Sequence, residues 1–497
     1  MLDLLIVGCG PVGAVAANLA GVANLSTLVI ERETGPFPLP RAIHFDAHIM
    51  RILQQAQIAR SLEPHTRVWE RSTFYGADST PIRVHDWPTD KPYGWAPHYL
   101  FYQPELEELL REGMSTHSSV ALRTGVEVTA WMQDLDGVTI TTRDVATGAT
   151  EEVRARYVIG ADGASSTIRA GMGADLVGSD FDEPWLVIDL LCGRELGRPN
   201  ESEMFCDPAR PATRVPGPGN HHRWEFMLLP GERAEELQSE QVIGELLKPW
   251  VELDEVEILR ASVYRFHSLL ATRWRDGRVF LVGDAAHQTP PFLGQGLCHG
   301  IRDVHNLLSR IAAAVRGGPG ETLLASYEAE RRPHVEQIIE MAVAAGREIC
   351  LLDPAAAAER DRRTRAAAHE GTLPPTTFQG MPPLREGLFT ATTGAGELFP
   401  QPRVRTGSGQ SELFDDVVGP VVTAVARPGL AERLGVTGVA VVNTASCSEV
   451  ERWFDLHGCE AAVVRPDRYV YGTADGPQET SLMIRELVAL YPVVDPR

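Results

Sequence analysis

The chain opens with apolar runs that alternate with a small-residue stretch, a pattern typical of a buried parallel sheet. Residues 3–8 (DLLIVG) form a short apolar run that ends at a glycine, and residues 26–31 form another. Between them, residues 11–21 are mostly small and apolar, which predicts a helix packed closely against its neighbours. Together the three segments predict a βαβ unit at the start of a doubly wound sheet.

The pattern changes further along the chain. Helices are predicted over 46–60 and 103–113. Strands with alternating polarity are predicted over 126–132, 136–143 and 151–159. From 176 to 274 the chain consists of aromatic-rich, strand-like pieces broken by Pro and Gly. This texture predicts a β-rich insert that supplies a substrate surface.

A buried-strand pattern returns at 278–283 (RVFLVG), and helices are predicted from Gly296 and over 327–349. Residues 353–390 are rich in Ala and Arg, then in Pro, and are predicted to form a linker. The last hundred residues alternate short β runs with helical pieces, which indicates a small α/β domain. We therefore divide the chain into a first domain (1–175 and 275–352), a β-rich inserted domain (176–274), a linker (353–390) and a C-terminal domain (391–497).

Charge and cysteine content exclude several classes of partner. The 497 residues include 46 basic and 67 acidic side chains, and the net charge of -21 repels phosphate backbones and anionic lipid surfaces. No segment approaches the ~18 consecutive apolar residues of a membrane span. The seven cysteines are scattered, with neither a CxxC pair nor metal-ligand spacing. We expect a cytoplasmic protein without a metal, a nucleic-acid partner or a membrane attachment, and a homodimer is an open alternative to a monomer.

A glycine-rich turn separates the first predicted strand from the first helix. It has the pattern GxGxxG and consists of Gly8, Gly10, Pro11, Val12 and Gly13. Glycines at this spacing let the backbone approach a pyrophosphate at the positive end of the helix. Glu31, followed by Arg32, ends the second strand, where a carboxylate can bind an adenosine ribose. The turn predicts a dinucleotide site but does not decide between FAD and NAD.

Two further motifs decide between these cofactors. Residues 158–169 read VIGADGASSTIR, and residues 283–291 read GDAAHQTPP. With the glycine turn before them, they resemble the ordered motifs of the class A FAD-dependent aromatic hydroxylases, the single-component flavoprotein monooxygenases. The resemblance spans the whole chain. It implies an α/β fold in which a Rossmann-like FAD-binding domain carries an inserted β-rich substrate domain and a C-terminal thioredoxin-like domain.

The resemblance also implies which residues contact FAD. Asp284 is expected to bind the ribityl chain, and the turn 290–296 is expected to pass along the flavin ring. A helix that begins near Gly296 would direct N–H groups at the flavin edge where charge accumulates on reduction. The remaining expected contacts are Arg41, Gln103, Asp162, Gly283, Pro291, Gly294, Gln295 and Leu297.

Within this family, segments such as 41–50 and 264–303 look most like the 3-(3-hydroxyphenyl)propionate hydroxylases. The implied reaction is hydroxylation of a phenolic ring, in which NAD(P)H reduces FAD and O2 adds to give a flavin C4a-hydroperoxide. A small phenolic acid is the expected substrate. Hydroxylases of polycyclic aromatic polyketides and ring epoxidases share the architecture and stay as alternatives. A flavin-binding protein without turnover is an alternative from another class.

Substrate contacts are expected from one face of a strand in the β-rich insert. Along 221–226 (HHRWEF), the side chains of His221, Arg223 and Glu225 alternate with the other three, so only one set can face a pocket. Arg223 matches an arginine that the family has near the flavin, and its guanidinium fork suits a substrate carboxylate. The other catalytic candidates are His44, Tyr264, His267 and Pro291.

Overall fold

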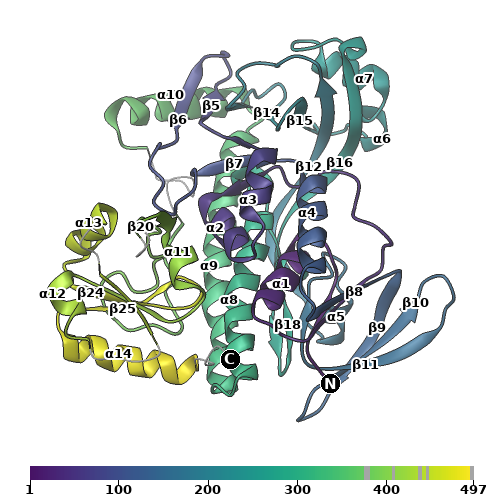
Figure 1. Cartoon of the computed structure of the whole chain (residues 1–497). Helices are drawn as coiled ribbons and strands as arrows, with labels where there is room; N and C mark the ends of the chain where they lie inside the picture. Colours follow the sequence, from purple (N-terminus) through teal and green to yellow (C-terminus); the bar gives the residue numbers. More distant parts are fainter. Residues whose placement is uncertain (374–380, 406–408, 435–438, 444–446, 493–497) are drawn as a thin grey trace.

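The computed structural model of the chain describes residues 1–373, 381–405, 409–434, 439–443 and 447–492. The architecture is α/β, with two eight-stranded sheets and a smaller four-stranded sheet in the C-terminal part (Figure 1). Two long helices, α8 (Gly296–Val315) and α9 (Gly320–Ile349), run between the C-terminal part and the rest of the molecule. Within the described residues, no helix combines the length and apolar character that a membrane span requires.

The first sheet has the parallel core that the opening pattern predicts. β1 (Leu2–Val7) pairs in parallel with β2 (Thr27–Glu31) and with β11 (Thr150–Gly160), and α1 (Pro11–Val22) connects the first two strands. The strand order is β17–β18–β11–β1–β2–β8. The remaining strands of this order are β8 (Val120–Thr124), β17 (Arg275–Asp276) and β18 (Val279–Leu281). This order confirms a Rossmann-like sheet.

Other elements pack against the central strands of this sheet and bury them, which explains their continuous apolar runs. Leu4, Leu5 and Ile6 in β1 are fully buried. α1 packs against α8 and α4 (Gln103–Ser115). The strands β9 (Val126–Gln133) and β10 (Val138–Asp144) extend from β11 as an antiparallel hairpin, as the alternating pattern predicts.

The second sheet contains the predicted β-rich insert together with strands from outside it. Its order is β19–β16–β12–β15–β14–β13–β5–β6. The strands of the insert are β12 (Leu176–Cys192), β13 (Glu201–Phe205), β14 (Ala212–Pro216), β15 (His221–Met227) and β16 (Val256–Ala271). The others are β5 (Arg71–Tyr75), β6 (Pro81–Asp86) and β19 (His287–Gln288). The sequence division assigns β5, β6 and β19 to the first domain, because pairing between distant strands leaves no local signal.

One face of the second sheet is covered by helices. Trp224 and Phe226 of β15 pack with Leu247 of α7 (Glu240–Leu247) in one apolar cluster. The short helix α6 (Ala234–Leu237) contributes Leu237 to the same cluster. Because successive side chains of a strand point to opposite faces, Arg223 and Glu225 lie on the other face, toward the first domain.

A small three-stranded sheet and short helices connect the two large sheets. The strands are β3 (His44–Asp46), β4 (Thr66–Val68) and β7 (His98–Phe101). The region predicted as one helix over 46–60 consists of α2 (Ala47–Gln55) and α3 (Ala59–Leu62), and Asp46 caps α2 by accepting hydrogen bonds from two backbone N–H groups. α5 (Thr167–Gly171) follows β11.

The predicted linker begins with a packed helix. α10 (Pro354–Glu370) starts at Asp353, whose side chain accepts a hydrogen bond from the N–H of Ala356 at 2.8 Å. Arg360 is buried and donates to the carbonyl oxygen of Cys206 at 2.6 Å, just after β13 of the second sheet. The Ala- and Arg-rich composition of 354–370 is therefore a helix-forming one. The prediction of a linker is wrong for these residues, and residues 374–380 of the same segment lie outside the described residues.

The C-terminal part is a small α/β unit, as its sequence pattern predicts. Its sheet has the order β23–β22–β24–β25, with β22 parallel to β23 and antiparallel to β24. The strands are β22 (Thr423–Ala426), β23 (Ala440–Asn443), β24 (Ala461–Val464) and β25 (Val470–Ala474). Its helices are α11 (Phe414–Val418), α12 (Pro428–Ala431), α13 (Ser448–His457) and α14 (Pro477–Leu490). The thioredoxin-like assignment stays a prediction.

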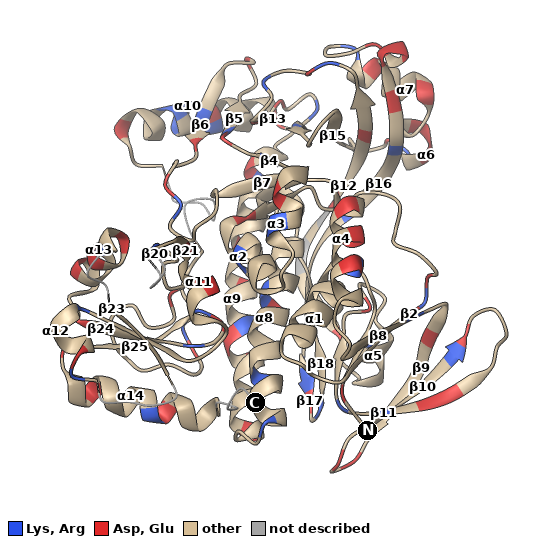
Figure 2. Ribbon diagram, viewed as in Figure 1, with Lys and Arg blue, Asp and Glu red and all other residues tan. Residues whose placement is uncertain are grey.

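Charged residues lie along the long helices and in the C-terminal unit (Figure 2), and ion pairs between buried ones connect the two. Glu330 of α9 accepts hydrogen bonds from both terminal nitrogens of Arg465, at 2.9 and 2.8 Å. Arg310 of α8 forms ion pairs with Glu330 at 2.7 Å and with Asp467 at 3.2 Å. The side chains of all four residues are 0% exposed. The C-terminal unit therefore completes a charge network inside the molecule rather than resting on its surface.

Candidate functional site

A cavity of about 390 Å³ lies between the carboxyl ends of the parallel strands and the open face of the second sheet. From the first domain it is lined by Gly10, Pro11, Val12, Ala161, Gly163, Val282 and Asp284. From the second sheet it is lined by Ser202, Met204, Thr213, Val215, Arg223 and Glu225. The remaining walls include Arg41, His44, Trp69 and Gln103, and the turn residues Thr289, Pro291, Phe292, Gly294, Gly296 and Leu297. Ligands of open α/β sheets bind at this edge.

The glycines of the first turn serve different purposes. Gly8 has φ +98°, and a Cβ there would lie 2.4 Å from the carbonyl oxygen of Ala161, so the backbone itself requires glycine. A Cβ at Gly13 would lie 2.1 Å from the carbonyl oxygen of Gly8, which shows how closely α1 abuts the strand. Gly10 has φ −69°, and a Cβ there would meet no atom within 4 Å. Its Cα borders the cavity, so the space that a side chain would fill is a cradle open to a ligand.

Glu31 lies at the end of β2 beside this turn. Its Oε2 accepts a hydrogen bond from the N–H of Cys9 at 2.6 Å, and its Oε1 accepts one from Glu33 at 2.8 Å. The carboxylate thus fixes the turn, and each oxygen keeps a further lone pair for a ligand hydroxyl. Arg32 forms an exposed ion pair with Glu33 and does not line the cavity.

The segment at Arg41 is held from two sides. Gln103 accepts hydrogen bonds on Oε1 from the N–H groups of Arg41 and Ala42, at 3.0 and 2.8 Å. Arg223 donates from Nη1 to the carbonyl oxygen of Arg41 at 2.7 Å. The Arg41 guanidinium lies over the ring of Phe37, 4.6 Å from its centroid, at the edge of the cavity. Gln103 and Arg223 fix the backbone, and the Arg41 side chain is presented to a ligand.

Asp284 faces the cavity at the end of β18. It accepts no hydrogen bond from the described residues, and the protein around it raises the pKa of its carboxyl by desolvation. Asp162 lies differently, because Ser166 Oγ donates to it at 2.6 Å and the N–H of Ile168 donates at 3.1 Å. Asp162 therefore braces the turn that presents Ala161 and Gly163, and its own side chain does not line the cavity.

The turn before α8 brings backbone rather than side chains to the cavity. Gly283 and Gly294 have φ +58° and +62°, values that favour glycine. The Gln295 side chain is buried and points away, since its Oε1 accepts a hydrogen bond from Arg302 at 2.9 Å. A Cβ at Gly296, the first residue of α8, would meet no atom within 4 Å, as at Gly10. The start of α8 therefore leaves a second open cradle beside Pro291 and Leu297.

His44 supports this turn. Its Nδ1 lies 3.3 Å from the carbonyl oxygen of Gly294, and its Nε2 lies 3.0 Å from Nδ1 of His98. Because a carbonyl can only accept, His44 donates from Nδ1 and accepts at Nε2 from His98. Burial, with a contribution from His98, lowers the pKa of His44 to about 3. A neutral imidazole with both nitrogens occupied positions the turn and is a poor general base.

Arg223 lines the cavity, but its charge is already paired. Its Nε donates to Asp189 Oδ1 at 2.7 Å, and Asp189 Oδ2 lies 2.9 Å from Arg260. Nη1 and Nη2 donate to the carbonyl oxygens of Arg41 and Pro40. The expectation of a free guanidinium fork for a substrate carboxylate is therefore wrong, because Arg223 ties the 40–41 segment to the second sheet.

Two catalytic candidates lie outside the cavity lining. Tyr264 and His267 are both on β16. The Tyr264 hydroxyl accepts a hydrogen bond from Arg260 at 2.9 Å. β16 is separated from the cavity-lining β15 by β12, which explains why strand periodicity alone did not exclude these residues.

The residues that the sequence did not identify come from β13 and β14. Ser202, Met204, Thr213 and Val215 alternate along their strands, so all four point to the same face as Arg223. Trp69 adds an apolar wall. The alternation of these side chains along β13 and β14 can be seen in the sequence. Only the order of the strands in the sheet shows which set of side chains faces the cavity.

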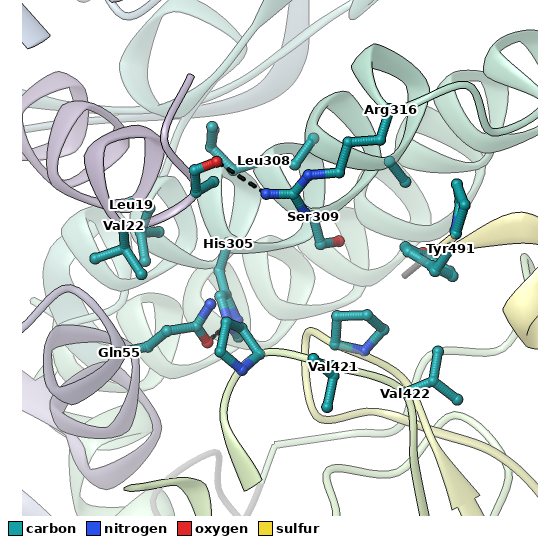
Figure 3. Close-up of a pocket in the computed structure, with 16 residues that line it drawn as sticks. Leu19, Val22, Gln55, His305, Leu308, Ser309, Arg316, Val421, Val422 and Tyr491 are labelled. Atoms are coloured by element: carbon teal, nitrogen blue, oxygen red, sulfur yellow. Dashed lines mark hydrogen bonds between the residues drawn. The ribbon is translucent and has the colours of Figure 1, made fainter. Parts of the chain in front are cut away.

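A second cavity, of about 260 Å³, lies where α1 and α8 meet the C-terminal unit (Figure 3). Leu19, His305 and Arg316 line it from the first domain, and Val421 and Tyr491 line it from the other side. Arg316 donates a hydrogen bond there to the carbonyl oxygen of Ala23 at 2.8 Å. None of the three sequence motifs reaches this cavity, so we assign the chemistry to the first one.

Sequence comparisons agree with this geometry. Residues 1–342 match the model of the FAD binding domain family. The chain is 35% identical to a probable NADH-specific resorcinol 4-hydroxylase of Rhodococcus jostii, over 98% of this chain and 95% of that protein. It is 34% identical to a 3-(3-hydroxy-phenyl)propionate/3-hydroxycinnamic acid hydroxylase of Burkholderia cenocepacia, over 95% and 93% of the two chains.

Solved structures share the fold over nearly the whole chain. The flavin-dependent monooxygenase PieE, solved with FAD and substrate, superposes with a TM-score of 0.84 at 23% identity and covers 99% of both chains. Aklavinone-11 hydroxylase, solved with FAD and aklavinone, has a TM-score of 0.78 at 21% identity over 98% of this chain and 99% of that one. The match extends past residue 342, so the C-terminal unit belongs to the shared architecture.

Proposed function

The chain belongs to the family of FAD-dependent aromatic hydroxylases, and from this premise we propose that it hydroxylates a single phenolic ring with NAD(P)H and O2. The relatives named above act on resorcinol and on hydroxyphenylpropionate, which are both monocyclic phenols. The cavity offers one place for such a ring, between the FAD motifs and the open face of the second sheet.

The residues present fit FAD. The cradles at Gly10 and Gly296 fit groups that approach the backbone closely, and Asp284 offers an acceptor for a hydroxyl. We infer that the glycine turn binds the pyrophosphate together with Arg41, and that Asp284 binds the ribityl chain. When bound, FAD supplies the redox chemistry, taking electrons from NAD(P)H and activating O2.

The protein's own contribution is binding, orientation and exclusion of water. Trp69, Met204, Val215 and Phe292 form apolar walls that keep bulk water from the reacting atoms. The paired Arg223 and the neutral His44 keep the flanking segments in place. The polar side chains of Thr213 on β14 and Glu225 on β15 can then orient the phenolic ring.

The observation that carries the proposal is that one cavity contains both the motif residues and the open face of the second sheet. The test is oxygen uptake and NAD(P)H oxidation by the FAD-loaded protein with a panel of monocyclic phenols, phenolic acids and polycyclic phenols. Stimulation by monocyclic phenols, with hydroxylated product identified by mass spectrometry, is expected. Stimulation by polycyclic substrates alone would favour the polyketide alternative, and none at all would favour a binding protein. The cytoplasmic location and the homodimer stay predictions.

A further inference from the structure

Glu225 and Thr213 form a polar pair on the wall of the cavity. Glu225 of β15 and Thr213 of β14 are directly opposite each other in the strand register, and Met204 of β13 is opposite Thr213. All three side chains line the cavity. The Glu225 side chain is 16% exposed.

The Glu225 carboxylate accepts no hydrogen bond from the described residues. Its nearest cation is Arg223, whose Nη1 lies 3.9 Å from Glu225 Oε1, beyond hydrogen-bond length. The Thr213 hydroxyl likewise makes no hydrogen bond within the described residues. Burial raises the pKa of Glu225, as expected for a carboxylate that has lost water without gaining donors. A ligand that brings an O–H donor would satisfy it.

We propose that Glu225, with Thr213 beside it, accepts the hydrogen bond of the substrate's phenolic hydroxyl, and that the enzyme therefore prefers a neutral phenol or diphenol to a phenolic acid. This inference rests on the proposed function and adds the substrate class. A hydrogen bond to a carboxylate increases electron density on the phenol oxygen and hence on the ring carbons that are hydroxylated.

The charges around the cavity favour a neutral substrate over an anionic one. The two positive charges of Arg223 and Arg260 are matched by the negative charges of Asp189 and Glu225, so this cluster is neutral overall and offers little to an anion. A substrate carboxylate on the second sheet would instead meet Glu225. Arg41 and Asp284, the remaining charged groups of the lining, lie with the FAD motifs.

The test measures equilibrium binding to the FAD-loaded protein without NAD(P)H, by calorimetry, so that no turnover is required. The ligands are resorcinol, 1,3-dimethoxybenzene and 3-(3-hydroxyphenyl)propionate. The variants are Glu225→Gln, Thr213→Val and the control Glu257→Gln, which removes an exposed acid from β16 of the same sheet. Wild type is expected to bind resorcinol at least about ten-fold more tightly than the other two.

Glu225→Gln is expected to weaken resorcinol binding by about ten-fold, to leave dimethoxybenzene unchanged and not to weaken the phenylpropionate. Thr213→Val is expected to weaken resorcinol by a few-fold, and it decides the matter if Glu225→Gln does not retain FAD. The control is expected to match wild type. The inference is overturned if both cavity variants bind resorcinol like wild type, or if wild type prefers the acid.

The two proposals fail in different ways. If wild type shows phenol-stimulated NAD(P)H oxidation but Glu225→Gln binds resorcinol as tightly as wild type, only the present inference is wrong. If no phenol binds or stimulates oxidation, the proposed function is wrong as well.

Discussion

Gly10 and Gly13 lie in one turn, yet glycine is needed at each for a different physical reason. A side chain at Gly13 collides with the protein's own backbone, whereas a side chain at Gly10 enters only the empty cradle. The same distinction applies to the two aspartates of the FAD motifs, since Asp162 is bonded within the protein and Asp284 is not. The groups that make no bond or contact within the protein are therefore the ones available to a ligand.

Gly10→Val should therefore abolish FAD retention without unfolding the protein. Its Cβ would occupy the cradle, so the purified variant is expected to be colourless, with at least about ten-fold weaker FAD binding and an unchanged Tm of the apoprotein. Gly193→Val is the control, because a Cβ there also meets no atom within 4 Å but lies outside the cavity lining. Full flavin content in Gly10→Val would contradict the placement of the cofactor.

Asp284→Asn is expected to raise the thermal stability of the apoprotein while it weakens FAD binding. The folded-state pKa of Asp284 is raised, so the folded apoprotein binds the proton more tightly than the unfolded chain does. This group therefore makes the wild-type apoprotein less stable as pH rises from the unfolded carboxyl pKa through the raised value. The neutral variant should lack this loss, so its Tm at pH 7 should be slightly higher than that of wild type, while FAD binding weakens. The difference should be small because the Asp284 side chain is exposed and water screens its charge.

Thermal melts of the two apoproteins at several pH values, together with FAD titrations, check this prediction. An equal Tm difference at low and neutral pH would show that the carboxylate charge is not the cause.

At the scale of elements, the Arg223 side chain connects β15 to the 40–41 segment through hydrogen bonds. It was expected to contact substrate, and its position on the cavity wall agreed with strand periodicity. Periodicity, however, gives only the face on which a side chain lies. Its partners Asp189, Pro40 and Arg41 come from distant parts of the chain, and they accept hydrogen bonds from all three guanidinium nitrogens.

Arg223→Ala should lower stability and FAD affinity rather than select against acidic substrates. Removing one partner of a buried ion pair costs about 3–5 kcal/mol, and the segment that presents Arg41 loses one of its two restraints. KM values for neutral and acidic phenols should change by the same factor, measured alongside urea unfolding. Arg233→Ala is the control, because this side chain is 70% exposed and, among the described residues, pairs only with exposed glutamates. A selective rise in KM for acids would restore the original hypothesis.

At the scale of the whole molecule, the C-terminal unit cannot be treated as an independent tail. Its Arg465 and Asp467 share a fully buried network with Arg310 and Glu330 of the long helices. Arg51 of α2 pairs in the same manner with Asp415 of α11, at 2.7 Å. The helix α8, which carries Arg310, also begins at the cavity, at Gly296.

Arg465→Met should destabilise the entire protein. It leaves Glu330 with one buried cation instead of two, at a cost of about 3–5 kcal/mol, and flavin release and loss of secondary structure should occur at one lowered temperature. Arg485→Met on the exposed side of α14 is the matched control. If the variant loses only the C-terminal structure and keeps its flavin, the two parts are independent.

The sequence by itself determined the βαβ opening, the dinucleotide turn and the family, because these depend on local backbone requirements. A strand that ends in closely spaced glycines can be recognised from neighbouring residues, and the motif around Asp284 is equally local. Tertiary structure alone decided the addition of β5 and β6 to the second sheet, the packing of α10 and the pairing of Arg223. These features depend on contacts between residues far apart in the chain. Whether a polar side chain serves the fold or a ligand depends on which distant atoms reach it, and for Arg223 and Glu225 that information is not contained in their alternation.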